Sequence, residues 1–252
     1  MKIRRLLFTV TLALGLTLAL LWALGGNSSR VRAATFQVTN TAASGAGSLP
    51  QAILNANSTP GHDTITFVSG LSGIIIPTDS LTITDDVTII GPGAEQLAVS
   101  GNNAYRVFYI GSGVAVTITN ITVRDGRATN GYTANYSEGG GIWSAGTLYL
   151  DRVHLVNNTA MPGFGKGGGL YVHQGSATLN EVQAFDNEAS YFGGGVFFNQ
   201  GNVMVKGTQV FSNAAPMSGG GGVYVAAANT TLSGTQVFSN SAIIGGGVYI
   251  EN

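Results

Sequence analysis

Two stretches of the chain decide its fold: Gly193-Gly194-Gly195-Val196-Phe197-Phe198 and Gly220-Gly221-Gly222-Val223-Tyr224-Val225. Similar stretches begin at Gly139, Gly167 and Gly245, and the residue after the glycines falls at 142, 170, 196, 223 and 248. A heptapeptide, Gly-Thr-Gln-Val-Phe-Ser-Asn, occurs unchanged at 207–213 and 234–240 and has the same period. Two independent markers that share a period of about 26 residues indicate a structural unit stacked on copies of itself.

Between the glycine runs, apolar and polar residues alternate with period two, as they do in β-strands. In 203–211 the apolar columns hold Val203, Val205, Thr208 and Val210. About 26 residues hold three short strands and three turns, which is one coil of a parallel β-helix, whereas a propeller blade needs roughly 40 residues. Because each coil leaves its edges unpaired, only stacking satisfies its backbone groups. The sequence therefore predicts an all-β parallel solenoid of about seven coils.

Residues 1–33 have the pattern of a secretory signal peptide. A basic start precedes an almost wholly apolar stretch at 6–24, and Val31 and Ala33 are small residues that fit a cleavage site after Ala33. Because this apolar stretch is longer than usual, an uncleaved membrane anchor is the alternative. We expect a mature chain that begins at Ala34 and is secreted or held at the cell surface or in the cell envelope.

Residues 34–63 are expected to cap the solenoid with a short strand and a small helix. Leu49, Ile53 and Ala56 have the spacing of one helical face, which would cover the open end of the β-helix. The β-helix itself is predicted to occupy 64–252. A solenoid needs a polar cap at each end, and none is visible after the last glycine run, so we expect a fragment of a longer protein.

The charge of the predicted mature chain restricts its partners. Without the signal segment the chain has six basic and twelve acidic residues, a net charge of −6, which disfavours nucleic acid and anionic lipid. A membrane would be contacted only through the N-terminal segment or through an anchor beyond the C-terminus. The chain has no cysteine, so stacked side chains and hydrogen bonds between coils must stabilise it.

Two parts of the sequence resemble known families. The stretch 38–67, with Ser44-Gly45-Ala46-Gly47-Ser48-Leu49-Pro50-Gln51-Ala52-Ile53, resembles the N-terminal region of bacterial secreted β-helix proteins of the CSLREA type, although Pro50 replaces their usual Arg and the Cys-Ser-Leu-Arg-Glu-Ala string is missing. The Gly-Gly-Gly-[Ile/Val/Leu] and Phe-x-Asn repeats resemble those of polymorphic outer-membrane proteins. These resemblances imply a right-handed, pectin-lyase-like β-helix. That superfamily includes lyases, hydrolases, adhesins and plain surface proteins, so it implies no single function.

One candidate column contains asparagine at equivalent positions of successive repeats: Asn158, Asn187, Asn213 and Asn240. Identical amides stacked about 4.8 Å apart can hydrogen bond along the axis as a structural ladder. Asparagine also tolerates the left-handed turn conformation. A polar binding track is the alternative.

A second column contains aromatic residues directly after the strand's first apolar residue: Trp143, Tyr171, Phe197, Tyr224 and Tyr249. Their neighbours are mostly apolar, so alternation predicts that the neighbours point inward and the rings outward. A solvent-facing strip of rings is typical of an interaction surface, and flat rings suit the apolar faces of a polysaccharide or a cell-surface glycan. The alternative is that the rings only stabilise the sheet by cross-strand pairing, or are buried.

No catalytic residue, metal site or cofactor is assigned from the sequence. Asp125 and Asp186 share a column, but an asparagine lies between them, so no pair of carboxylates on adjacent coils suits a hydrolase or a calcium site. His62, His154 and His173 occupy different repeat positions and lack metal-ligand spacing, and we expect them to be solvated.

The leading functional hypothesis is a non-enzymatic, adhesin-like or structural β-helix that binds glycans through the aromatic column. The alternative is a carbohydrate-active enzyme, either a polysaccharide lyase or a hydrolase, and a plain structural spacer is the third hypothesis.

Overall fold

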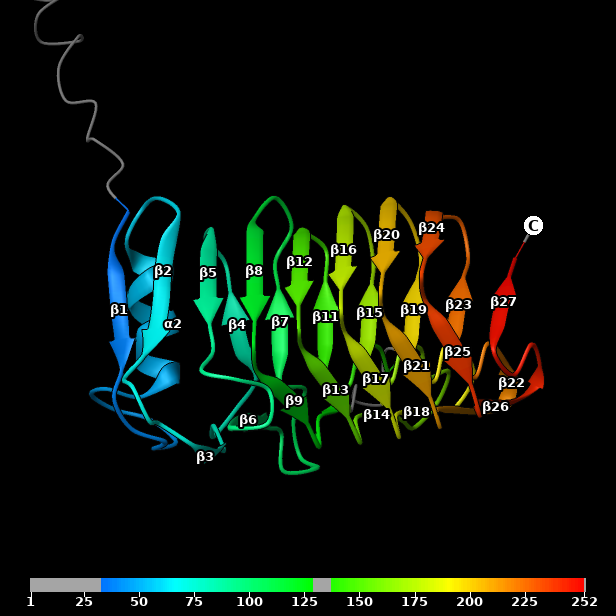
Figure 1. Ribbon diagram of the computed structural model, residues 1–252, viewed down its shortest axis with the longest axis horizontal. Helices are drawn as coiled ribbons and strands as arrows, with labels where there is room; N and C mark the ends of the chain where they lie inside the picture. The colour runs from blue at the N-terminus through cyan, green and yellow to red at the C-terminus, as the bar shows by residue number, and fades with distance from the viewer. Residues whose placement is uncertain (1–32, 129–136, 252) are drawn as a thin grey trace, which may run out of the picture. The chain divides into compact units, whose positions relative to one another are not determined.

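The computed structural model describes residues 33–128 and 137–251, which form a parallel β-solenoid of about eight turns (Figure 1). Four parallel sheets run along it. Sheet A contains β1 (Thr35–Val38), β2 (Asp63–Phe67), β5 (Val87–Ile90), β8 (Ala115–Thr119), β12 (Thr147–Asp151), β16 (Ser176–Asn180), β20 (Asn202–Lys206) and β24 (Asn229–Ser233). Sheet B contains β3 (Gly73–Ile75), β6 (Leu97–Ser100), β9 (Thr122–Arg124), β13 (His154–Val156), β17 (Gln183–Phe185), β21 (Gln209–Phe211) and β25 (Gln236–Phe238). Sheet C contains β4 (Leu81–Ile83), β7 (Phe108–Ile110), β11 (Ile142–Ser144), β15 (Leu170–Val172), β19 (Val196–Phe198), β23 (Val223–Val225) and β27 (Val248–Ile250). Sheet D contains β10 (Arg127–Ala128), β14 (Thr159–Ala160), β18 (Glu188–Ala189), β22 (Ala214–Gly219) and β26 (Ser241–Ile244).

Each coil passes through the sheets in a fixed order. The first coils run from sheet A through sheet B to sheet C, as the predicted three-strand coil requires. From β10 onward, a short strand of sheet D is added between sheets B and C, which the sequence analysis did not predict. The inward residues of its first strands are alanines, Ala128, Ala160 and Ala189, which form a small buried cluster of their own. Strands of two residues with such small side chains give too little alternation to be recognised from the sequence.

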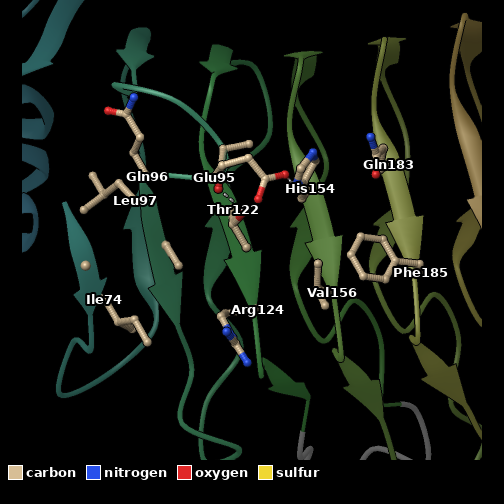
Figure 2. A pocket seen from close by; sticks show the side chains of 13 residues that line it. Ile74, Glu95, Gln96, Leu97, Thr122, Arg124, His154, Val156, Gln183 and Phe185 are labelled. Atoms are coloured by element: carbon tan, nitrogen blue, oxygen red, sulfur yellow. Dashed lines mark hydrogen bonds and ion pairs between the residues drawn. The ribbon is translucent and has the colours of Figure 1, made fainter.

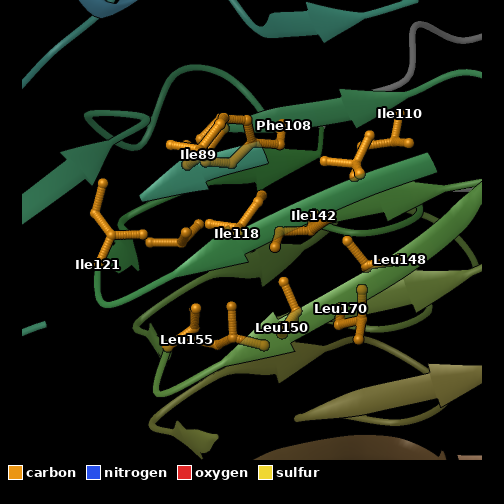
Figure 3. Close-up of a cluster of buried hydrophobic side chains, with 14 of the residues drawn as sticks. Ile89, Phe108, Ile110, Ile118, Ile121, Ile142, Leu148, Leu150, Leu155 and Leu170 are labelled. Atoms are coloured by element: carbon orange, nitrogen blue, oxygen red, sulfur yellow. The ribbon is translucent and has the colours of Figure 1, made fainter. Parts of the chain in front are cut away.

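The registers place equivalent residues of successive repeats directly beside one another. Val196 pairs with Val223, and Phe197 pairs with Tyr224, as the repeat spacing predicted. The apolar columns between the sheets form one continuous core, part of which is drawn in Figure 3. The predicted inward residues Val203, Val205 and Val210 all belong to this core.

The predicted N-terminal helix is present as α2 (Leu49–Ser58). Ser48 is its N-cap, and the side chain of Ser48 accepts a hydrogen bond from the Gln51 amide at 3.3 Å. The buried face of α2 consists of Leu49, Ala52, Ile53 and Ala56, which join the main core beside β1, β2 and β4. The predictions of a signal peptide or an anchor fall on residues 1–32, which lie outside the described residues. Within the described residues, the structure contains no helix long and apolar enough to cross a bilayer.

Candidate functional site

The aromatic column of sheet C is a continuous stack of rings. Tyr109 of β7, which the sequence analysis did not include, stacks on Trp143 with ring centroids 4.6 Å apart. The stack continues through Tyr171, Phe197, Tyr224 and Tyr249 with centroid separations of 6.5, 5.2, 4.9 and 5.0 Å. Tyr109 was missed because its repeat lacks the glycine triplet. Aromatic pairs of this kind contribute about 0.5–1.5 kcal/mol each beyond the area they bury.

The prediction that this column faces solvent is wrong for its central rings. The rings do lie outside the main core, but Tyr171, Phe197 and Tyr224 are only 2, 2 and 4% exposed. The covering chain is the segment before each glycine run, where Glu138, Lys166, Phe192 and Gly219 form their own line of parallel bridges. Phe192 packs on Tyr224 at 4.7 Å between ring centroids.

The glycine runs explain this cover. The first glycine of each run has a φ of about 60°, for example 62° at Gly193, and a Cβ there would lie 2.5 Å from the carbonyl oxygen of Val196. This left-handed turn reverses the chain tightly, so that the residue before the run lies against the column of rings, as Phe192 does against Phe197 and Tyr224. Burial, together with the nearby Glu138, also raises the pKa of the Tyr171 hydroxyl, which keeps it neutral. These rings therefore form a second core and not a free surface.

The asparagine column is a buried chain of hydrogen bonds. The Nδ2 of Asn158 donates to Oδ1 of Asn187, that of Asn187 to Asn213, and that of Asn213 to Asn240, each at 2.9 Å. The same amides also donate to backbone carbonyls of the preceding coil. The left-handed conformation occurs one residue earlier, at Asn157, Asp186, Ser212 and Ser239, and not at the ladder asparagines. With its amides turned inward, this column offers no polar track to a ligand.

The outer face of sheet B carries two further columns. One contains Ile74, Ala98, Thr122, His154, Gln183, Gln209 and Gln236, and the other contains Ser100, Arg124, Val156, Phe185, Phe211 and Phe238. The three phenylalanine rings are stacked nearly parallel, with centroids 4.9 and 5.0 Å apart. None of the three is fully buried, and Phe238 is exposed. The sequence signal for this surface is Gln-x-Phe at 183–185, 209–211 and 236–238, the last two of which lie within the repeated heptapeptide.

A pocket of about 410 Å³ lies over this face, across β6, β9, β13 and β17 (Figure 2). A neighbouring pocket of about 580 Å³ shares five lining residues with it: Ala94, Glu95, Gln96, His154 and Gln183. The loop at 91–96 forms one wall, held by the Thr122 hydroxyl, which donates to the Ala94 carbonyl at 2.7 Å. Arg124 lines the first pocket and Arg152 the second.

His154 lies within this pocket and is not solvated, contrary to the sequence-based expectation. Its side chain is 15% exposed, and its Nδ1 lies 3.5 Å from Oε1 of Glu95, which is 89% exposed (Figure 2). The ring of Phe185 lies edge-on to the imidazole at 6.3 Å. Burial lowers the pKa of His154, an effect that the Glu95 carboxylate opposes. The imidazole is therefore held in its neutral form at pH 7.

Replacing His154 by Gln should remove one part of the acid sensitivity of the protein. A His whose folded-state pKa is lowered binds fewer protons in the folded than in the unfolded chain, so stability falls as pH drops below about 6.5. The next two coils carry glutamine at this position, as Gln183 and Gln209. We expect His154→Gln to show a smaller fall in the unfolding midpoint between pH 7 and pH 5, measured by thermal denaturation. His62→Gln, at an exposed histidine, is the control, and an equal change in both variants would contradict the assignment.

The other histidines and charges are placed without an evident reactive centre. His62 contacts Thr88 at 2.8 Å, and His173 stacks on Trp143. Arg124 pairs with its neighbour Asp125 at 2.7 Å. In the part of the chain that the structure describes, no cluster of three or more His, Asp or Glu residues could hold a metal ion.

The sheets and registers define the class of the protein as a parallel β-solenoid with an N-terminal strand and helix packed on its first coils. No protein-family model, curated protein or solved structure matches the chain.

Proposed function

We propose that the protein is a secreted or cell-surface β-solenoid of the right-handed, pectin-lyase-like kind, and that it binds a glycan chain on the outer face of sheet B. The observation that supports this proposal is the stack of Phe185, Phe211 and Phe238, which runs beside a column of glutamines and ends at the pocket. The basic and apolar leader at 1–24 supports export.

The chemistry of this face suits a neutral sugar chain. Flat apolar rings pack against the apolar faces of sugars, while amides both donate and accept hydrogen bonds with hydroxyl groups. The Nε2 of Gln209 already donates to Oε1 of Gln236 at 3.0 Å, which leaves further donor and acceptor positions of both amides for a ligand. The two pockets include both arginines and glutamates, and the mature chain has a net charge of −6, so a polyanion is disfavoured.

This proposal moves the binding surface from sheet C to sheet B. The hypothesis for Trp143, Tyr171, Phe197, Tyr224 and Tyr249 required a solvent-facing strip, and the three central rings of that column are buried. A ligand could reach only the partly exposed ends of the stack.

Replacing Phe211 by Ala should weaken binding to the recognised glycan about tenfold, because one stacking contact is worth on the order of 1.4 kcal/mol. A glycan array on the purified protein identifies the ligand, and titration calorimetry with that ligand measures the effect. The matched control is Met204→Ala, which removes an exposed apolar side chain from sheet A of the same coil. Trp143→Ala serves as the control for the sheet C column.

Two results would contradict the proposal. If Trp143→Ala weakened binding and Phe211→Ala did not, the sheet C column would be the binding surface. If no glycan bound in the array, the sheet B face would not be a glycan-binding surface.

A second candidate function is a carbohydrate-active enzyme, and the observation that favours it is the pairing of Glu95 with His154 in the pocket. A neutral imidazole can accept a proton from a substrate, and Arg124 in the same pocket could neutralise a uronic acid carboxylate. Incubation with acidic and neutral polysaccharides, followed by assays for unsaturated products and for reducing ends, tests this function. Activity that is lost in His154→Gln would establish the enzyme.

A further inference from the structure

The first coil contains a buried carboxylate in a position that is otherwise apolar. Asp63 is 0% exposed and begins β2, and its register partners in the next coils of sheet A are Val87 and Val116. One carboxylate oxygen, Oδ1, accepts a hydrogen bond from the backbone nitrogen of Ala34 at 2.6 Å. The other oxygen, Oδ2, is buried and has no hydrogen-bond partner.

This arrangement lacks a positive charge. The ion pairs found among the described residues involve Asp125 and Asp151, each paired with an arginine, and none includes Asp63. A buried carboxylate is costly unless it is paired, and an unsatisfied buried oxygen adds about 1–3 kcal/mol to that cost. Asp63 therefore lacks both a positive charge beside it and a donor for Oδ2. The Ala34 nitrogen, which donates to Oδ1, supplies neither, because as a peptide amide it carries a single proton and no charge.

The Ala34 nitrogen is also the atom that the predicted cleavage would release. Val31 and Ala33 are small residues at the third and first positions before the Ala33–Ala34 bond, and Ala33 is exposed. On the other side of the bond, the Ala34 carbonyl accepts a hydrogen bond from the Thr64 amide at 2.8 Å, which holds Ala34 against β2. The bond thus joins an exposed residue to one that is fixed in the first coil.

We propose that an exported endopeptidase hydrolyses the Ala33–Ala34 bond and that the new α-ammonium group of Ala34 forms a buried ion pair with Asp63. Water adds across the peptide bond, which leaves a carboxylate on Ala33 and an ammonium group on Ala34. The ammonium group has three protons and a positive charge, so it can donate to both Oδ1 and Oδ2. Cleavage therefore completes the first coil, and the mature chain is more stable than the precursor.

The first test is the N-terminus of the exported protein. The full chain is produced with its leader in a secreting bacterial host, and its intact mass is measured. We expect a chain that begins at Ala34, whereas a chain that begins at any other residue, or that retains Met1, overturns the proposal.

The second test measures whether the charge at Ala34 acts on Asp63. One protein is the chain processed to Ala34, and the other carries a single glycine inserted between Ala33 and Ala34, so that its α-ammonium group is displaced by one residue. In the chain that begins at Ala34, Asp63→Asn should lower the melting temperature by about 5–10 °C, because the substitution removes one partner of a buried ion pair. In the glycine-extended chain the same substitution should leave the melting temperature unchanged or raise it.

Asp186→Asn is the matched control, because Asp186 is an exposed carboxylate in a left-handed turn, where asparagine is accepted at the equivalent Asn157. Asp186→Asn should leave the melting temperature of both chains unchanged. An equal effect of Asp63→Asn in the two chains would show that Asp63 acts only through its shape and hydrogen bond, and would overturn the ion pair. If the Asp63→Asn protein does not fold, the melting temperatures of the two chains with Asp63 are compared, and equal values overturn the proposal.

Discussion

Gly194→Ala should prevent the solenoid from folding, or lower its melting temperature by about 10 °C or more. A Cβ at residue 194 would lie 2.3 Å from the carbonyl oxygen of Ala214 and 2.5 Å from that of Gly221, both in the next coil. Neither oxygen can move away without separating adjacent coils, because both belong to backbone that is hydrogen bonded to its neighbours. Steric clashes of this kind in a close-packed interior exceed about 4 kcal/mol. Gly194 does not have a positive φ, so the expected destabilisation comes from the steric clash of the Cβ and not from backbone strain.

The matched control for this prediction is Gly247→Ala, in the glycine run two repeats further along the chain. A Cβ there would meet only the side chain of Val237 at 3.5 Å, which is an ordinary contact, and Gly247 also lacks a positive φ. We expect this variant to fold with a melting temperature within about 2 °C of the original, since the replacement of glycine by alanine also stiffens the unfolded chain. Circular dichroism and thermal denaturation of both variants make the comparison. A stable Gly194→Ala protein would show that the coils are not packed as closely as described.

The sequence predicted the solenoid because a repeat converts sequence position directly into spatial position. Once Val196 and Val223 are known to be equivalent, stacking makes them neighbours, and the apolar columns follow from alternation. This reasoning applies only where the repeat marker is present. It did not find Leu97–Ser100, which lies in a coil without the glycine marker.

The sequence could not predict contacts between residues whose relative positions are not determined by the repeat period. Tyr171 is in the predicted column and outside the main core, yet whether it meets solvent depends on how the glycine turn folds the preceding segment over it. The pocket arises because the loop with Glu95, in an irregular coil, approaches His154 from another coil. The contact between Ala34 and Asp63 likewise joins the first two strands of sheet A, which lack the glycine marker. Each of these features requires side-chain positions that alternation alone does not give.

The second large effect is expected at the centre of the asparagine ladder. Asn213→Ala should destabilise the protein by about 3–6 kcal/mol, because it leaves several buried groups without partners at about 1–3 kcal/mol each. The Oδ1 of Asn213 accepts from both the backbone nitrogen and the Nδ2 of Asn187, and its Nδ2 donates to the Ala184 carbonyl. Alanine replaces none of these bonds, and the coil is too tightly packed to admit the chain movement that would restore them.

Asn229→Ala is the matched control, because Asn229 is exposed and its Nδ2 makes only a long hydrogen bond of 3.3 Å to Asn202. Water replaces that bond in the variant, so we expect a change below about 0.5 kcal/mol. Urea denaturation followed by circular dichroism measures both free energies of unfolding, and a loss of slope in Asn213→Ala would indicate that the coils on either side unfold separately. Equal stability of the two variants would mean that the amide ladder adds nothing to the stacking of the coils, and the sheets and aromatic rings alone would have to hold the solenoid together.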